Sequence, residues 1–315
     1  MHSFKTCAPL IVAMACAAAL SAEDLSGAAP TRINTADLPN AVQLTEKVIS
    51  GGQPHGEAGF QELRDIGVKT VISVDGAKPD VELAKKYGLR YVHLPHGYNG
   101  IPKDRLFELT AAVEELPGPI YIHCHHGKHR SPAAAAAACV SAGYLTNDEG
   151  LAVLDVAGTS NGYRGLFAVV RGARPIDGEA IRAANVEFHE TVAIPPLAEA
   201  MTLVEHTHDH LKTVAKSGWK ASRNHPDIDP PHEALLFREN FTELLRTDEV
   251  RRQPEEFQEI LRQSETYAKE IEELLAAGSA DQEKLNASLD RISAGCVECH
   301  QKYRDTPLSE NAAGK

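Results

Sequence analysis

Two short runs of the chain place cysteine and histidine at spacings that support two different chemistries. The first run is His123-Cys124-His125-His126-Gly127-Lys128-His129-Arg130-Ser131. The second run is Cys296-Val297-Glu298-Cys299-His300. The residues of the first run are suited to holding an anion beside a thiolate, and those of the second to carrying a haem bound through two thioethers.

The first run connects a strand-like segment, 120–123, to an alanine-rich segment with helical character. A strand-loop-helix passage points backbone N–H groups and the positive end of the helix at an anion. Five residues separate Cys124 from Arg130, so the loop can wrap one phosphoryl group while the guanidinium binds two of its oxygens. Together with Lys128, these positive groups favour the thiolate of Cys124, which is therefore the candidate nucleophile.

Ser131 is expected to stabilise that thiolate when it leaves in a second step. The residues between the nucleophile and the arginine form the predicted phosphate-binding loop: His125, His126, Gly127, Lys128 and His129. We expect the three histidines to tune the charge of the loop. Metal binding by them is not expected, because a loop that surrounds an anion turns its N–H groups inward.

The first run resembles the His-Cys-x5-Arg-Ser/Thr signature of cysteine-dependent protein tyrosine and dual-specificity phosphatases. The segments 127–130 and Gly51-Gly52-Gln53-Pro54 are most similar to the atypical dual-specificity phosphatases of the plant and fungal type. The resemblance covers a predicted domain at 41–172. It implies two-step hydrolysis of a phosphorylated protein or a small phosphomonoester through a phosphocysteine on Cys124.

The same resemblance implies a general acid, usually an aspartate on a loop before the cysteine, that protonates the leaving oxygen. The corresponding loop is 93–104, and its only carboxylate is Asp104, for which helix capping is the competing role. Asn99 stands where an acid would be convenient. His96 and Asp75 are the other candidates for this role.

The second run has the C-x-x-C-H pattern, in which Cys296 and Cys299 form the thioethers and His300 is the axial ligand of the iron. All three residues share one face of a predicted helix at 281–304. A thioredoxin-like redox pair would need its own fold, and a zinc site would need a second pair of ligands nearby. Covalent haem is therefore the preferred interpretation.

Its position near the end of the last of four predicted helices resembles the cytochrome c-prime family and its bundle relatives. The resemblance implies one covalent haem c, whose iron is either open to a diatomic gas or bound by a methionine of the first helix. Met201 and His208 lie on the inward stripe of that helix and are candidate sixth ligands, although Met201 also suits a core. Arg304 is a candidate partner for a propionate. A redox partner and a homodimer through the bundle are further expectations.

The elements that must position these residues divide the chain into two domains. Strand-like segments alternate with helical ones up to residue 172, which predicts an α/β domain with a mainly parallel sheet flanked by helices. A connecting segment, 173–195, leads to a predicted all-α four-helix bundle at 196–305 and a tail at 306–315. The bundle helices are predicted at 197–216, 231–246, 254–277 and 281–304.

Composition and the amino terminus restrict the location and the partners. The formal net charge of −12 argues against binding of duplex nucleic acid. Residues 1–22 contain Lys5, an apolar stretch and a small-residue end at Ala22, which predicts a signal peptide and an exported, periplasmic protein. A lipidated Cys16 is the alternative. No later segment is long enough to span a membrane, and Cys139 is expected to be a buried core residue.

Three hypotheses follow. The first is an exported phosphatase controlled by the redox state or gas binding of its haem; the second is an electron-transfer or gas-sensing cytochrome whose phosphatase-like domain only binds a phosphoryl ligand. Sulfur transfer at the thiolate is the third. Separately, His206 and His210 lie four residues apart on one helix face and are candidate ligands of a metal ion.

Overall fold

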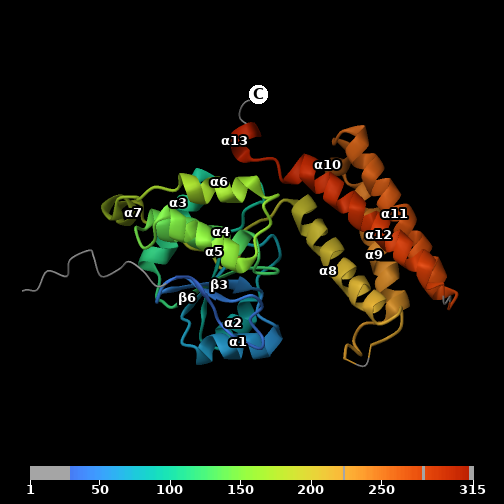
Figure 1. The fold of residues 1–315 in the computed structure, drawn as a ribbon, viewed down its shortest axis with the longest axis horizontal. Coiled ribbons are helices and arrows are strands. Elements are labelled where there is room, and N and C mark those ends of the chain that lie inside the picture. Colours follow the sequence, from blue (N-terminus) through green and yellow to red (C-terminus); the bar gives the residue numbers. More distant parts are fainter. Residues whose placement is uncertain (1–28, 223, 279–280, 312–315) are drawn as a thin grey trace, which may run out of the picture.

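The computed structural model describes residues 29–222, 224–278 and 281–311, and the predicted signal peptide lies outside them. These residues form an α/β part followed by a helical part, which lie side by side (Figure 1). Hydrophobic clusters lie on both faces of the sheet in the first part, and a separate cluster fills the second. No helix in these ranges is long and apolar enough to cross a membrane.

The α/β part is built on a six-stranded mixed sheet with strand order β1-β2-β3-β6-β4-β5. The strands are β1 (Thr31–Arg32), β2 (Val42–Gln43), β3 (Val48–Gly52), β4 (Thr70–Ser73), β5 (Arg90–His93) and β6 (Ile120–Cys124). Strands β3, β6, β4 and β5 are parallel, whereas β1, β2 and β3 pair antiparallel. The expected sheet was mainly parallel; the antiparallel edge arises because the segment 44–47 is too short for a crossover.

Helices cover both faces of this sheet (Figure 1). One face carries α3 (Lys103–Glu115), α4 (Arg130–Ser141), α5 (Asn147–Ala157) and α6 (Arg164–Gly172), and the other carries α1 (Gly56–Asp65) and α2 (Val81–Lys86). Successive strand residues alternate between the two cores: Val71 and Tyr121 pack on one face, and Ile72 and Ile122 on the other.

Helix α4 is buried along its whole length. Its central residues 133–138 are all alanine, so α3, α5 and α6 can approach it closely while it also packs on the sheet. This packing fixes the amino-terminal end of α4 at the carboxyl end of β6. The predicted phosphate loop connects these two ends.

The helical part contains four long helices: α8 (Pro196–Lys216), α9 (Pro230–Arg246), α11 (Glu255–Ala276) and α12 (Gln282–Cys299). Short helices α7 (Gly178–Ala184), α10 (Asp248–Arg251) and α13 (Leu308–Asn311) lie before, between and after them. Helix α8 packs on α9, α9 on α11, and α11 on α12, which is consistent with the expected bundle. The contact between α8 and α12 is looser than these three.

The last predicted helix does not continue as one α-helix to Arg304. It becomes a π-helix at His300–Arg304, where the Asp305 N–H donates to the His300 carbonyl over 2.8 Å. The chain then returns to the α/β part. The Leu308 N–H donates to the Asn99 carbonyl over 2.9 Å, and Arg164 pairs with Glu310. The segment after the C-x-x-C-H run is therefore docked on the loop that precedes α3.

Candidate functional site

Cys124 is the last residue of β6 and lies at the base of the loop that leads into α4. It is 3% exposed, and its Sγ lies 3.3 Å from the Ser131 Oγ. The Ser131 hydroxyl also donates to the Gly51 carbonyl over 2.8 Å. The serine thus touches the sulfur and is held by the end of β3. To donate to a Cys124 thiolate, its single hydroxyl proton would have to turn away from Gly51.

The loop turns its carbonyl groups outward. Three of them accept hydrogen bonds from outside the loop: His125 O from Gln53 N (3.1 Å), Gly127 O from Asn40 Nδ2 (2.8 Å) and Lys128 O from Thr159 Oγ1 (2.6 Å). In the described part of the chain, the N–H groups of residues 125–129 donate to no protein atom. A loop with bound carbonyls and unpaired N–H groups is suited to an anion.

Gly127 allows this loop to lie against the end of β3. Its φ is 69°, and a Cβ at this position would be 2.3 Å from the Gly52 nitrogen. Only glycine satisfies both the backbone conformation and the close approach.

Arg130 is held beside Cys124 by a buried ion pair. Its Nη2 donates to the Asp75 Oδ2 over 3.1 Å, and the two residues are 8% and 4% exposed. Burial would raise the pKa of Asp75, but Arg130 and nearby histidines outweigh it and lower the pKa to about 2. The Arg130 Nε is buried and has no partner among the described residues, so it remains available to a phosphate oxygen.

The three general-acid candidates have different surroundings. Asp104 is exposed in the first turn of α3, makes no side-chain cap, and has no hydrogen bond or ion pair with Cys124 or Arg130 among the described contacts. Asp75 is ionised, and its carboxylate is paired with Arg130. His96 is buried; its Nδ1 donates to the Gly97 carbonyl over 2.8 Å, and its Nε2 has no partner in the described ranges. Burial lowers the pKa of His96 to about 4.

Tyr98 connects the site to the helical part. The Arg130 Cζ lies 4.4 Å, and the Arg304 Cζ 3.9 Å, from the centroid of the Tyr98 ring. Sequence reasoning missed this residue. An aromatic residue in the loop before α3 was the available signal, but only the fold places it between two arginines from distant segments.

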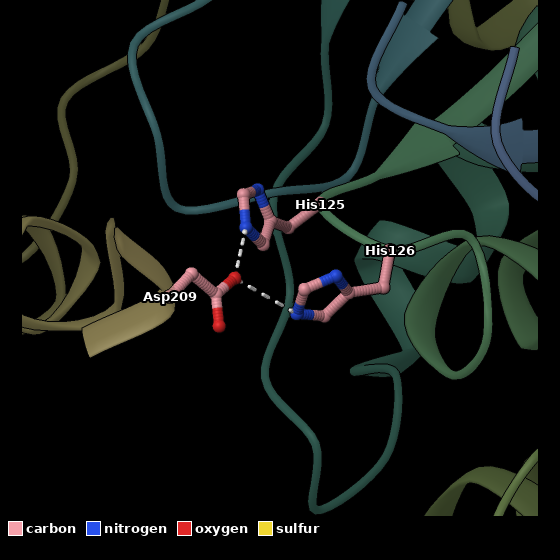
Figure 2. Close-up of side chains that lie close together, drawn as sticks. All are labelled: His125, His126 and Asp209. Atoms are coloured by element: carbon pink, nitrogen blue, oxygen red, sulfur yellow. Dashed lines mark hydrogen bonds and ion pairs between the residues drawn. The ribbon is translucent and has the colours of Figure 1, made fainter. Parts of the chain in front are cut away.

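The loop histidines point in different directions. His125 and His126 turn away from the loop toward α8, where they meet Asp209 (Figure 2). The centroid of the His129 ring lies 4.5 Å from the centroid of the Tyr163 ring. Burial lowers the pKa of His129 to about 4. Lys128 is exposed. In this arrangement the loop can offer an anion its backbone N–H groups, while the His125 and His126 rings face the helical part.

Cys296, Cys299 and His300 lie together where α12 ends and the π-helix begins. Both thiols are free. The Arg304 guanidinium lies against Tyr98 and near the Tyr163 hydroxyl, and its charge also acts on Cys296, Cys299 and His300. Its expected pairing with a propionate stays a prediction. Cys139 is fully buried in the α/β core, as expected, and burial raises its pKa to about 12.

The two candidate sixth ligands lie at different levels of the helical part. The His208 Nε2 is 3.1 Å from the Ser293 Oγ, and its ring stacks on Phe237 with 5.6 Å between the centroids. Helices α8 and α12 run in opposite directions (Figure 1). Met201 is seven residues before His208, and His300 is seven residues after Ser293. Met201 and His300 are therefore at the same level, about 10 Å from His208 along the helix axes.

Comparisons with known proteins give structural likenesses to phosphatases. No family model and no curated protein sequence matches the chain. Among solved structures, TpbA from P. aeruginosa is 22% identical, with 50% of this chain and 97% of that chain covered and a TM-score of 0.40. The core catalytic domain of the PP-IP phosphatase SIW14 from S. cerevisiae is 15% identical, with 48% and 93% covered and a TM-score of 0.41. Tk-PTP, in a mutant form, is 19% identical, with 42% and 94% covered and a TM-score of 0.36. At these identities and scores, the function of this chain has to be argued from its own site.

Proposed function

We propose that the α/β part is a cysteine-dependent phosphomonoester phosphatase of the tyrosine or dual-specificity type. One observation carries the proposal: the Cys124 sulfur, touched by the Ser131 hydroxyl, lies at the base of a loop whose N–H groups and the Arg130 Nε are unpaired among the described residues. A dianion is the ligand that satisfies these donors together.

In the proposed reaction the Cys124 thiolate attacks phosphorus. An S–P bond forms, the ester P–O bond breaks, and the leaving oxygen takes a proton from a donor. Water then attacks the phosphocysteine; the S–P bond breaks, inorganic phosphate forms, and the thiolate leaves beside the Ser131 hydroxyl. Arg130 and the loop N–H groups hold the phosphoryl oxygens through both steps.

His96 is the proposed proton donor. Asp104 is exposed at the start of α3, and Asp75 is bound to Arg130, whereas the His96 Nε2 is buried and unpartnered in the described ranges. A bound phosphate dianion would favour the imidazolium form of His96, which could then protonate the leaving oxygen.

Hydrolysis of p-nitrophenyl phosphate by the full chain tests this activity. Turnover should be lost in Cys124→Ser and in Arg130→Ala and kept in Cys139→Ala, which removes a cysteine from the core of the same domain. Turnover of thiosulfate but not of the phosphate ester would indicate sulfur transfer instead. Cys124-independent hydrolysis would contradict the proposed nucleophile.

We further propose that the helical part is a cytochrome c-prime-like four-helix bundle that carries one covalent haem c. The residues fit the group: two free thiols and His300 lie together at the end of α12, and α8 packs less closely on α12 than on α9. Bound haem would supply a redox centre, and a gas could bind where the sixth ligand is absent or displaced. Met201 is the preferred sixth ligand, because it lies level with His300 and the His208 Nε2 already contacts Ser293.

Haem content tests this second assignment. After expression in a host that exports the chain and attaches haem, denatured wild-type protein should retain one haem per chain, and protein with Cys296→Ala and Cys299→Ala should retain none. Cys139→Ala is the matched control and should keep its haem. Replacement of Met201 by Leu should change the ferrous absorption spectrum if Met201 binds the iron.

We propose that the haem segment controls the phosphatase through Arg304 and Tyr98. Arg304 lies four residues after His300, and the Tyr98 ring contacts both Arg304 and Arg130. A change in the haem segment that moves Arg304 would therefore act on the phosphate-binding guanidinium. We also propose that the chain is exported. In an exported protein the Cys124 thiolate is prone to oxidation, so control of the phosphatase by the haem would have a purpose there.

A phosphoryl-ligand sensor is the second candidate function. Asp75 occupies one edge of Arg130, and the described contacts place no carboxylic acid against Cys124. A protein that binds phosphate and fails to turn over aryl phosphates would support this alternative.

A further inference from the structure

A cluster of nitrogen and oxygen ligands lies where the phosphate loop meets α8. The Asp209 Oδ2 is 3.4 Å from the His125 Nε2 and 3.8 Å from the His126 Nε2 (Figure 2). One ligand atom from each of these three residues lies within 4.8 Å of the other two. The cluster joins the α/β part to the helical part.

The spacing of these atoms suits ligands of one ion. Bonds of ~2.0–2.1 Å in a tetrahedral zinc site place neighbouring ligand atoms about 3.3 Å apart. The two His–Asp separations are close to that value and longer than a good hydrogen bond. The Glu205 Oε1 is 3.6 Å from the His126 Nε2 and lies at the edge of the cluster.

We propose that His125, His126 and Asp209 bind a divalent transition metal ion of the zinc class, with water in the fourth position. Two imidazole nitrogens and a carboxylate oxygen are a common donor set for such ions. The expectation that these histidines bind no metal came from the inward N–H groups of the loop. Those same N–H groups leave the side chains of His125 and His126 outside the loop, facing α8.

Neighbouring charged groups leave the proposed ligand atoms available. Lys212 pairs with the other carboxylate oxygen of Asp209, Oδ1. The centroid of the His206 ring lies 5.0 Å from the centroid of the His125 ring, at the edge of the cluster. His210 bonds to Glu233 over 2.8 Å within the helical part. Metal binding by the His206 and His210 pair stays a prediction, and the pair from the loop is the one proposed here.

An ion at this position would join the phosphate loop directly to the bundle. It would hold the loop from the face opposite the anion and restrain α8 against it. Without an ion, a protonated His125 can hold Asp209 by a charged hydrogen bond. A loop joined to α8 by an ion and a loop joined to α8 by protonated His125 differ in zinc content. Zinc content can be measured without reference to catalysis or haem.

The experiment uses the full chain with its haem, treated with a chelator and then dialysed against zinc buffered at micromolar and lower free concentrations. Bound zinc is measured by atomic emission. Wild-type protein should bind one zinc ion per chain, and Asp209→Asn and His126→Ala should each weaken binding at least ~10-fold. His232→Ala, which removes an exposed histidine of α9, should bind zinc as the wild type does.

Absence of stoichiometric zinc from the wild type would overturn the proposal, as would equal binding by Asp209→Asn and His126→Ala. Circular dichroism of both variants checks that they are folded. Asp209 and His126 are partly exposed, so either replacement should be tolerated. Loss of phosphatase turnover would not affect this readout, so failure of the metal site and failure of the proposed function can be told apart.

Discussion

At the scale of single residues, Arg130 has one partner in the structure and a second one that is proposed. Its buried guanidinium is held by Asp75, and the proposed phosphate site uses the same group. Asp75→Asn leaves a buried cation without its counter-charge and should destabilise the protein by about 3 kcal/mol. Inorganic phosphate, which restores a negative charge beside Arg130, should raise the melting temperature of Asp75→Asn more than that of the wild type.

Thermal unfolding with and without phosphate measures this difference. Asp65→Asn is the matched control, because Asp65 pairs with its neighbour Arg64 on the exposed surface. Equal phosphate-induced shifts in Asp75→Asn and in the wild type would mean that Asp75 and the ligand do not share Arg130.

His96 gives the site a predicted pH dependence. The pKa of His96 is lowered to about 4 by burial, and a proton donor acts only in its protonated form. With His96 as the acid, kcat/KM for p-nitrophenyl phosphate should therefore decline as the pH rises above about 4. His96→Asn should lower the rate and remove this decline. A decline that persists in His96→Asn would assign the acid to another group.

The sequence predicted the residues that lie on one continuous segment. Cys124, Arg130 and Ser131 are close because a single strand-loop-helix passage brings them together. The contacts of Asp75 and Tyr98 with Arg130 could not be predicted, because they depend on how separate loops end at the same edge of the sheet. Likewise, the meeting of His125 with Asp209 requires the two parts to be placed side by side.

At the scale of elements, the phosphate loop depends on its close approach to β3. Gly127→Ala would place a Cβ 2.3 Å from the Gly52 nitrogen at a positive φ, so the loop must shift. We expect a loss of about 1–3 kcal/mol of stability and at least a ~10-fold loss of kcat/KM. Gly158→Ala is the matched control: its φ is 79°, but a Cβ there meets open space.

Gly158→Ala should lose about 1 kcal/mol and keep full activity. Denaturant unfolding and p-nitrophenyl phosphate kinetics on both variants make the comparison. Unchanged kinetics in Gly127→Ala would show that the loop does not need this close approach.

Elements with a strong periodic pattern were predictable, and short or irregular ones were not. The central parallel strands and the four long helices have the expected apolar periodicities. Strands β1 and β2 have two residues each, too few for an alternation to be recognised. The change from α12 to a π-helix at His300 also has no signal in the sequence, since neither proline nor glycine occurs there.

At the scale of the whole molecule, Arg304 is the proposed link between haem and phosphatase. In the wild type the turnover of p-nitrophenyl phosphate should differ between ferric and CO-bound ferrous protein. Arg304→Ala removes the cation next to Tyr98 and should abolish that difference while haem content is kept. Arg291→Ala, which removes a similar contact with Tyr267 inside the helical part, should preserve it.

A difference between haem states that survives in Arg304→Ala would place the coupling elsewhere. Equal rates in both haem states of the wild type would indicate that the two parts are joined without control. The salt bridge between Arg164 and Glu310 would then only hold the tail against the α/β part.

Co-purification of bound haem with phosphatase turnover shows whether one chain carries both functions. Exported protein is separated by size, and haem absorbance and p-nitrophenyl phosphate turnover are measured across the same peak. Turnover should coincide with haem absorbance in the wild type and be absent from Cys124→Ser, whose haem peak should be unchanged. A haem-containing peak without turnover, or turnover that persists in Cys124→Ser, would contradict this expectation.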